Sequence, residues 1–335
     1  MFKLHLFMLA TASLSVLLSP ARSSAVTLTE DFSTNPSATG WRIWGDTNLF
    51  QWDTTNQNLR VTWDSRQTNS YCYRPLGTIL AKDDDFSLAF DLRLDDFTSG
   101  IDPAKTNSPF QISVGLLRHA DATASSFIRG SGSESPNLIE FSFFPDPGGA
   151  WQWGPSLTAI LCDRTGTNWS FGSAFDTLTT NDLYRVELVF DATNGVLNVE
   201  ILRNGQPFVT IPPATLGANF TDFRADILAV CSYSDAGQWP GYEGSILAHG
   251  TVDNFNLTLP PPPVQELVGI YTNGVWKASF LTRSNWVYAW ERSTDLTNWN
   301  PLSPELFAGT GWWVFLEELS PPAGKAFYRV RAQRP

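Results

Sequence analysis

The stretch LYRVELVFDATNGVLNVEILRNGQPFVTI, residues 183–211, consists of three apolar segments joined by two Asn-Gly pairs. In the first two segments every second side chain is apolar, which is the period of a β-strand with one buried face. Asn-Gly tolerates the positive φ angles that tight hairpin turns require. The stretch therefore predicts an antiparallel meander.

Similar patterns recur from Val26 to Thr258, and no helical periodicity there is convincing. FSLAFDLRL, residues 86–94, places its Phe and Leu side chains on one strand face and its polar ones on the other. Further strands are expected at 58–63, 70–75, 110–117, 138–144, 157–162, 223–233 and 248–257. About a dozen strands with turn-rich connections favour a sandwich of two sheets.

The N-terminus has the pattern of a secretory signal peptide. Lys3 precedes an apolar run from Leu6 to Leu18, and small residues follow up to Ala25. The run is shorter than the roughly 20 residues that a membrane-spanning helix needs, so no membrane span is expected. We expect cleavage near residue 25, with Ser23 as a second option, and a secreted or cell-surface protein.

Four consecutive prolines in LPPPPV, residues 259–264, predict a stiff linker. The expected organisation is a signal peptide at 1–25, a large domain at 26–258, the linker, and a small domain at 265–335. Without residues 1–25 the chain has 20 Lys or Arg against 33 Asp or Glu, a net charge of −13. This charge argues against nucleic acid as a partner.

Four segments of the large domain resemble the concanavalin A-like lectin/glucanase superfamily, particularly its laminin G-like bacterial members. They are LTEDFSTNPSATGW, LIEFSFFPDPGG, YRVELVFDATNGVLNVEILRNGQPF and GTVDNFNLT, and the resemblance covers about 230 residues. It implies a jelly-roll β-sandwich whose first and last strands are neighbours, with EDF beside VDNF. The predicted fold is all-β, a jelly-roll sandwich followed by a small β-sandwich.

The small domain carries the segments YAWERSTDLTNW and FYRVRA, which together resemble a fibronectin type III-like accessory domain found at the end of many secreted bacterial proteins. That resemblance implies no transferable activity. Trp286, Tyr288 and Trp290 share one face of a strand, which predicts a small aromatic core. STDLTNW is expected to form a turn stabilised by its own side chains, with Leu296 and Trp299 packed back as hydrophobic anchors.

The catalytic pattern that the resemblance implies for glucanases, E-x-D-x-x-E on one strand, is absent. The nearest substitute is Glu140 with Asp146, six residues apart in IEFSFFPD, although Pro145 bends the path between them. Only His119 and His249 remain after cleavage, too few for histidine-based metal centres. We therefore expect no catalysis, and keep a polysaccharide hydrolase or lyase at Glu140 and Asp146 as the alternative.

Sugar rings stack on aromatic faces that loops or an open sheet leave exposed. Five aromatic residues lie among Gly and Pro, where loops are expected: Trp151, Trp153, Trp169, Trp239 and Tyr242. Asp163 and Arg164 are close enough in sequence to act as polar partners. The leading hypothesis is a non-catalytic protein that binds a carbohydrate or another extracellular polymer, and a structural matrix protein is a further alternative.

The one candidate cofactor is structural calcium, at Glu30, Asp31 and Asp253, because the implied strand order brings these residues together; the alternative is that these carboxylates are ordinary solvated turn residues. No D-x-D-x-D-G loop is present. The three cysteines, Cys72, Cys162 and Cys231, are an odd number, so at least one is unpaired. Cys231 alternates with apolar residues and is expected to be a buried thiol.

Overall fold

The computed structural model describes residues 25–129, 135–146, 154–302 and 307–335. The chain divides into two compact units, 25–263 and 264–333. Regular structure in both units is almost entirely β, which confirms the predicted fold class. The expected signal peptide, except for its last residue, lies outside the described residues, and no described helix is long and apolar enough to cross a membrane.

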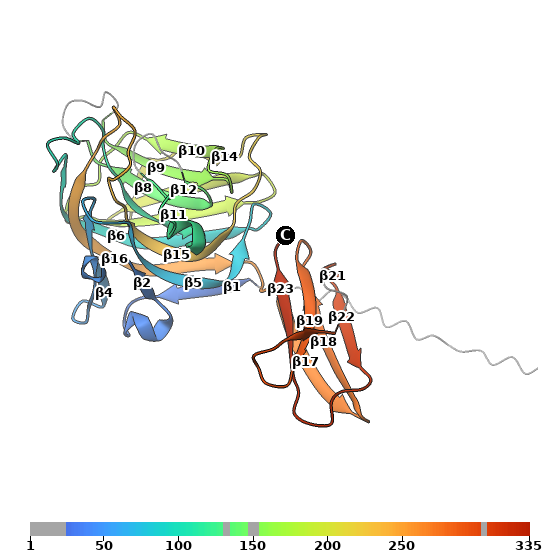
Figure 1. Ribbon diagram of the computed structural model, residues 1–335. Helices are drawn as coiled ribbons and strands as arrows, with labels where there is room; N and C mark the ends of the chain where they lie inside the picture. Colours follow the sequence, from blue (N-terminus) through green and yellow to red (C-terminus); the bar gives the residue numbers. More distant parts are fainter. Residues whose placement is uncertain (1–24, 130–134, 147–153, 303–306) are drawn as a thin grey trace, which may run out of the picture. The chain divides into compact units, whose positions relative to one another are not determined.

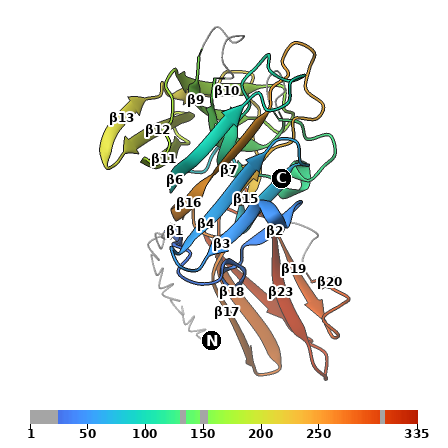
Figure 2. The same cartoon turned by 90° about the vertical axis from the view of Figure 1, so that its left-hand side faces the viewer.

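The larger unit contains a nine-stranded antiparallel sheet. Its central order is β13-β12-β11-β6-β16-β4-β3, with β1 added beside β16 and β14 beside β12 (Figures 1 and 2). These strands are β13 (Gln206–Thr210), β12 (Val196–Arg203), β11 (Leu183–Asp191), β6 (Phe86–Ser99), β16 (Ile246–Leu259), β4 (Asn58–Asp64), β3 (Phe50–Asp53), β1 (Val26–Glu30) and β14 (Ala214–Thr215).

The second sheet of this unit has seven antiparallel strands in the order β10-β9-β8-β7-β15-β5-β2. They are β10 (Trp169–Ala174), β9 (Ser156–Cys162), β8 (Leu138–Phe144), β7 (Ile112–Leu117), β15 (Ala225–Ser232), β5 (Ser70–Leu80) and β2 (Arg42–Trp44). Short helices η1 (Pro36–Thr39), η2 (Thr47–Leu49) and α1 (His119–Ala122) lie in the connections.

The two sheets pack face to face, as Figures 1 and 2 show from two directions. Phe90 of β6 contacts Phe141 of β8 with ring centroids 6.1 Å apart, and Phe97 contacts Phe143 at 5.7 Å. The predicted sandwich is therefore correct. The expected pairing of the first and last strands is also confirmed, because β1 runs antiparallel to β16 with Glu30 opposite Phe255.

All three cysteines are buried, and no disulfide joins them. The prediction of a buried thiol at Cys231 is confirmed. Burial raises the pKa of the Cys72 thiol to about 12 and that of Cys231 well above its usual value. Neither thiol is therefore a nucleophile at neutral pH.

The smaller unit also has two sheets. One has the order β17-β18-β22, and the other has β19 at its centre, paired with β20, β21 and β23. The strands are β17 (Val264–Thr272), β18 (Val275–Thr282), β22 (Trp313–Glu318), β19 (Val287–Ser293), β20 (Asn300–Pro301), β21 (Phe307–Ala308) and β23 (Phe327–Gln333). The segment 259–264, expected to be a linker, begins with the last residue of β16 and ends with the first of β17.

The stretch YAWERSTDLTNW is part of the scaffold of the smaller unit. Trp286, Tyr288 and Trp290 are buried, as expected. Asp295 accepts hydrogen bonds from the backbone N–H groups of residues 297 and 298, which fixes the turn. The expected anchoring by Leu296 is wrong, since Leu296 has a φ of 64° at the turn and its side chain is exposed.

Candidate functional site

The outer face of the seven-stranded sheet, opposite the core, carries the polar and aromatic side chains of interest. Strand register aligns them in two rows that run from β5 to β10. The first row is Tyr71, Cys231, Ser113, Ser142, Thr158 and Ser173, and the second is Tyr73, Ala229, Gly115, Glu140, Ile160 and Phe171. Both rows begin under covering loops and end on the edge strand β10.

The covered part of this face holds a buried charge. The Glu140 side chain is fully buried and accepts five hydrogen bonds, the longest of them from Gln111 Nε2 at 3.4 Å. We call Glu140 and the residues that donate the four shorter ones the Glu140 network. The donors are Arg129 Nη2 at 2.5 Å, Tyr233 OH at 2.6 Å, Ser142 Oγ at 2.8 Å and Ser113 Oγ at 3.2 Å. The carboxylate is thus paired and hydrogen-bonded, as a buried charge must be.

Loops that follow β7 and β15 cover the Glu140 network. Tyr71 OH donates to the carbonyl of Ala122 in α1 at 2.9 Å, and the rings of Phe127 and Tyr233 have centroids 6.2 Å apart. Burial, with the nearby Cys231 and Glu140, raises the pKa of Tyr233 well above its usual value. The Tyr233 hydroxyl therefore stays protonated and donates a hydrogen bond to Glu140.

The alternative of catalysis by Glu140 and Asp146 is not supported by this geometry. Glu140 has no exposed surface, whereas Asp146 is exposed, beyond the end of β8. A general acid or base must reach the substrate directly or through one water. Because Glu140 is covered and its oxygens are occupied, it stabilises the sheet instead.

The open part of the outer face is formed by β10 and by Phe175, which follows it. Trp169, Phe171 and Phe175 have exposed fractions of 50%, 58% and 63%, and we call these three residues the aromatic stripe. Within β10, positions 169, 171 and 173 alternate along the strand and so point to one side, and Phe175 follows directly after the strand ends. Ser173 Oγ is 3.1 Å from Thr158 Oγ1 of β9, which places a hydroxyl pair next to the rings.

Edge strand β10 is held firmly from its inner side. A Cβ atom added at Gly172 would overlap the carbonyl oxygen of Pro212, so only glycine permits this close approach.

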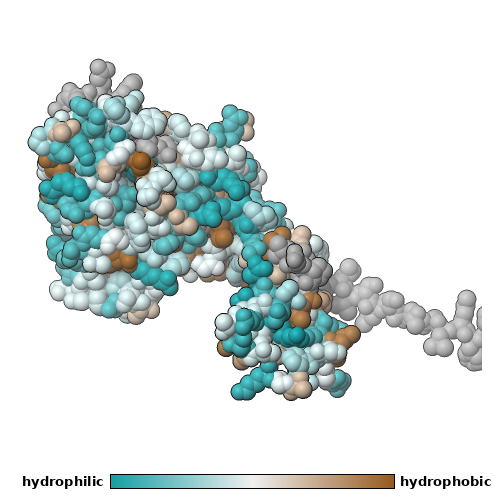
Figure 3. Space-filling view, in the orientation of Figure 1, coloured by the Kyte–Doolittle hydropathy of each residue, from teal (hydrophilic) through white to brown (hydrophobic). Residues whose placement is uncertain are grey.

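Elsewhere, on the face of the larger unit visible in Figure 3, hydrophobic residues are mostly isolated among hydrophilic ones. Isolated surface hydrophobics are common, whereas several together on one face suggest a binding surface.

The structure separates the residues that the sequence grouped as ligand-binding. Trp169 belongs to the aromatic stripe, in a strand and not in the expected loop. Trp239 and Tyr242 are exposed in the connection between β15 and β16, in a turn closed by a hydrogen bond from the Tyr242 N–H to the Trp239 carbonyl. Trp151 and Trp153 lie outside the described residues.

Asp163 does not fit its predicted role as a polar partner for a ligand. Its side chain is buried and accepts hydrogen bonds from Thr165, Asn168 and Thr221. Burial alone would raise the pKa of Asp163, but these hydrogen bonds hold it below the usual range. Asp163 therefore stabilises the turn between β9 and β10, while its neighbour Arg164 is exposed.

Sequence reasoning missed Phe171 and Phe175. The signal was present, because WSFGSAF repeats an aromatic or a serine at every second position. The glycine at 172 and the preceding TGTN turn made the segment look like a loop.

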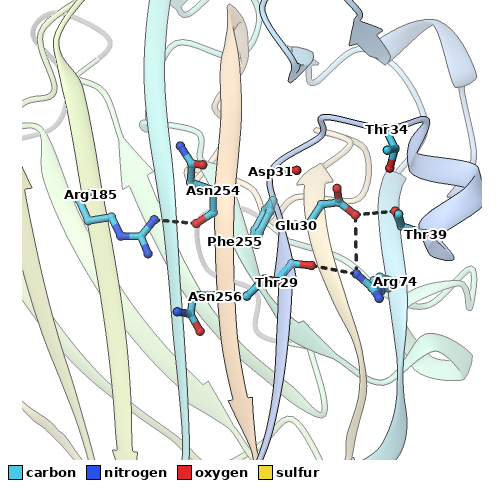
Figure 4. A pocket seen from close by; sticks show the side chains of 10 residues that line it. All are labelled: Thr29, Glu30, Asp31, Thr34, Thr39, Arg74, Arg185, Asn254, Phe255 and Asn256. Atoms are coloured by element: carbon cyan, nitrogen blue, oxygen red, sulfur yellow. Dashed lines mark hydrogen bonds and ion pairs between the residues drawn. The ribbon is translucent and has the colours of Figure 1, made fainter.

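A polar pocket of about 370 Å³ lies where β1 pairs with β16 (Figure 4). It is lined by Thr29, Glu30, Asp31, Thr34, Thr39, Arg74, Arg185, Asn254, Phe255 and Asn256. The register of β16 against β6 shifts between Asp253 and Asn256, and Asn254 has a φ of 50° there. This bulge bends β16 and opens the pocket.

Glu30, one of the predicted calcium ligands, already has several hydrogen-bond partners in the loop after β1. It is buried and accepts hydrogen bonds from the Phe32 N–H at 2.9 Å, Thr39 Oγ1 at 2.5 Å and Trp41 Nε1 at 3.0 Å. Arg74 Nη1 lies 3.6 Å from the same carboxylate. Glu30 therefore fastens the loop after β1 to the sandwich.

The predicted calcium site is not assembled among the described residues, where no three His, Cys, Asp or Glu side chains are placed to hold a metal ion. Asp253 does lie near other carboxylates. Burial, together with Asp91, Asp31 and Glu30, raises the pKa of Asp253 to about 6, against the opposing effect of the Asn254 N–H. Calcium binding by Glu30, Asp31 and Asp253 stays a prediction.

No protein-family model matches this sequence, and no curated protein matches it significantly. Several solved structures are similar in fold. Peanut lectin has 10% identity and a TM-score of 0.43, covering 71% of this chain and 99% of its own; lectin II from Ulex europaeus has 12% and 0.45, covering 70% and 98%. An alginate lyase has 12% identity and a TM-score of 0.41, covering 69% and 96%. At these identities and scores, the similarity assigns no ligand or chemistry to this chain.

Proposed function

We propose that this protein binds an extracellular carbohydrate or similar polymer through the aromatic stripe, without catalysing its breakdown. The observation that carries the proposal is the exposure of Trp169 and Phe171, each at least half exposed on one face of β10. Aromatic rings with hydroxyl groups beside them suit sugar rings, which have apolar faces and hydroxyl edges. The hydroxyls are supplied by Ser173 and Thr158.

The absence of an accessible acid–base pair at Glu140 and Asp146 supports a binding role over the hydrolase or lyase alternative. The apolar run and small residues at the N-terminus support export of the protein. Determining the N-terminal residue of the protein recovered from culture medium tests this export, and a mature chain that begins near Val26 is expected.

Binding is tested by pull-down of the mature protein on a panel of insoluble and bead-linked polysaccharides. The variants Trp169→Ala and Phe171→Ala should each lose about tenfold or more in affinity, as expected for central aromatic contacts. Phe315→Ala is the matched control, because Phe315 is an exposed aromatic strand residue of the smaller unit, and it should bind like the unmodified protein.

The same panel separates the alternatives. Loss of binding in Trp239→Ala, with Phe171→Ala unaffected, would move the site to the loop between β15 and β16. New reducing ends or unsaturated uronates during incubation would show an enzyme. Failure of the unmodified protein to bind any polysaccharide contradicts the proposal and favours a structural matrix protein.

A further inference from the structure

The shape of the aromatic stripe constrains the length of its occupant. Within β10, Trp169, Phe171 and Ser173 occupy alternate positions, so four residue steps, about 13 Å at about 3.3 Å per residue, separate the first from the last, and Phe175 follows the end of the strand. One sugar ring covers only a fraction of that length. A ligand that uses all three rings must therefore be a chain, extended along the direction of β10.

The charge around the stripe constrains the chemistry of that chain. From Gly130 to Tyr184, a segment that contains β8, β9 and β10, the sequence has a single Lys or Arg, which is Arg164. The same segment has six acidic residues: Glu134, Glu140, Asp146, Asp163, Asp176 and Asp182. Arg129, the cation of the Glu140 network, is buried and paired with Glu140.

Polymers that carry carboxylate or sulfate groups are normally held by Arg or Lys, which form charge-assisted hydrogen bonds to them. The stripe offers hydroxyls and rings in their place. In addition, residues 26–258 contain 27 acidic against 13 basic residues, so the larger unit repels polyanions at long range.

Resting on the proposed function, we infer that the occupant of the aromatic stripe is an uncharged polysaccharide bound as an extended chain, and that polyuronates and sulfated glycans are rejected. Ring stacking and neutral hydrogen bonds supply the affinity, so binding is insensitive to salt.

Affinity gel electrophoresis of the mature chain tests this inference. The neutral probes are a β-1,4-glucan, a β-1,3-glucan and a β-1,4-xylan, and the anionic probes are alginate and polygalacturonate. We expect at least one neutral probe to retard the protein and neither anionic probe to do so. The affinity for the neutral probe should change less than twofold between 50 and 500 mM NaCl. Short oligomers of the retained glycan should gain affinity as they lengthen.

Two variants separate the possible failures. Phe171→Ala should abolish retardation, whereas Arg164→Ala should leave it within twofold. If alginate or polygalacturonate is retained, and this retention is lost in Phe171→Ala, in Arg164→Ala and at high salt, the inference is overturned while the stripe remains a carbohydrate site. If no probe is retained, or if Phe171→Ala has no effect on a retained probe, both the inference and the proposed function fail.

Melting temperatures control for folding. A value for each variant within 2 °C of the unmodified protein shows that misfolding does not cause the loss of binding; if Phe171→Ala falls outside this range, Trp169→Ala takes its place.

Discussion

The Glu140 network and the aromatic stripe occupy the same outer face of one sheet, yet the fold treats them in opposite ways. The charged Glu140 is fully buried, while the aromatic Phe171 is 58% exposed. Ordinary partition between water and protein would expose the charge and bury the ring. Under the proposed function, the covered half of the face belongs to the fold and the open half contacts the ligand.

The largest effect on stability is expected from Glu140→Ala, which tests the covered half. Removing the carboxylate leaves Arg129 buried without its counterion, and breaking such a pair costs about 3–5 kcal/mol of unfolding free energy. Urea unfolding at pH 7 measures this loss. In the folded fraction, glycan affinity should remain within a few-fold.

The double variant Glu140→Ala with Arg129→Met controls for the charge. Because the unpaired cation is then absent, the double change should cost less than the sum of the two single changes. Additive costs, or a Glu140→Ala protein as stable as the unmodified one, would show that the ion pair does not organise this half of the face.

The next effect is expected from Gly172→Ala, which tests how β10 is held. A methyl group at this position overlaps the Pro212 carbonyl, so the strand must move, at a cost of about 1–3 kcal/mol. Glycan affinity should fall as well, because the flanking rings move with the strand. The neighbouring change Ser173→Ala, which adds no atoms, is the matched control and should leave the unfolding midpoint almost unchanged.

A smaller effect is expected from Asp253→Asn beside the polar pocket. The pKa of Asp253 is raised from an unfolded value of about 3.9 to about 6 in the folded protein. Folding therefore takes up a proton between these values, and ionised Asp253 destabilises the protein above pH 6. The amide should stabilise the protein by about 1 kcal/mol at pH 7, after allowance for solvent screening, and by nothing near pH 4.

Thermal unfolding at both pH values measures this difference, and Asp31→Asn shows how much of it comes from the neighbouring carboxylate. A stabilisation that is equal at pH 4 and pH 7 would contradict the raised pKa. If Ca²⁺ raises the melting temperature of the unmodified protein at pH 7 and Asp253→Asn abolishes the rise, the predicted calcium role of Asp253 is supported.

The strands that the sequence predicted well are those with one face in the core. FSLAFDLRL alternates as it does because Phe86 to Leu94 cover the inner face of β6, and residues 138–144 were predicted with their observed bounds as β8. Hydrophobic residues alternate where one face of a strand contacts the core, so these strands could be predicted from the sequence.

The outer face was harder to predict because its order depends on which strands are neighbours. Nothing local to Glu140 shows that Arg129 and Tyr233 will cover it, since those residues come from separate loops. Strand β10 was missed because the inner side of an edge strand can use glycine and serine, as at Gly172, and so lacks the apolar alternation of a core strand. In β10 it is the exposed aromatic residues that alternate. Trp169 was therefore predicted correctly as an exposed aromatic residue, but it was assigned to a loop and not to a strand.

The smallest effect on stability, and the sharpest test of the comparison, is expected from Phe171→Ala. The Phe171 ring is more than half exposed, so its removal should change the unfolding free energy by no more than about 0.5 kcal/mol. The same change removes the central ring of the aromatic stripe and should cost about tenfold in glycan affinity.

Phe141→Ala is the opposite control. Phe141 lies on the core side of the same sheet against Phe90, and the loss of its ring should lower the unfolding free energy by about 3–5 kcal/mol. If Phe171→Ala destabilises the protein as Phe141→Ala does, the ring belongs to the fold, and the division between a structural and a binding half of the face is wrong. If it weakens binding alone, the exposed ring is kept by this chain for its ligand, since it does almost nothing for the fold.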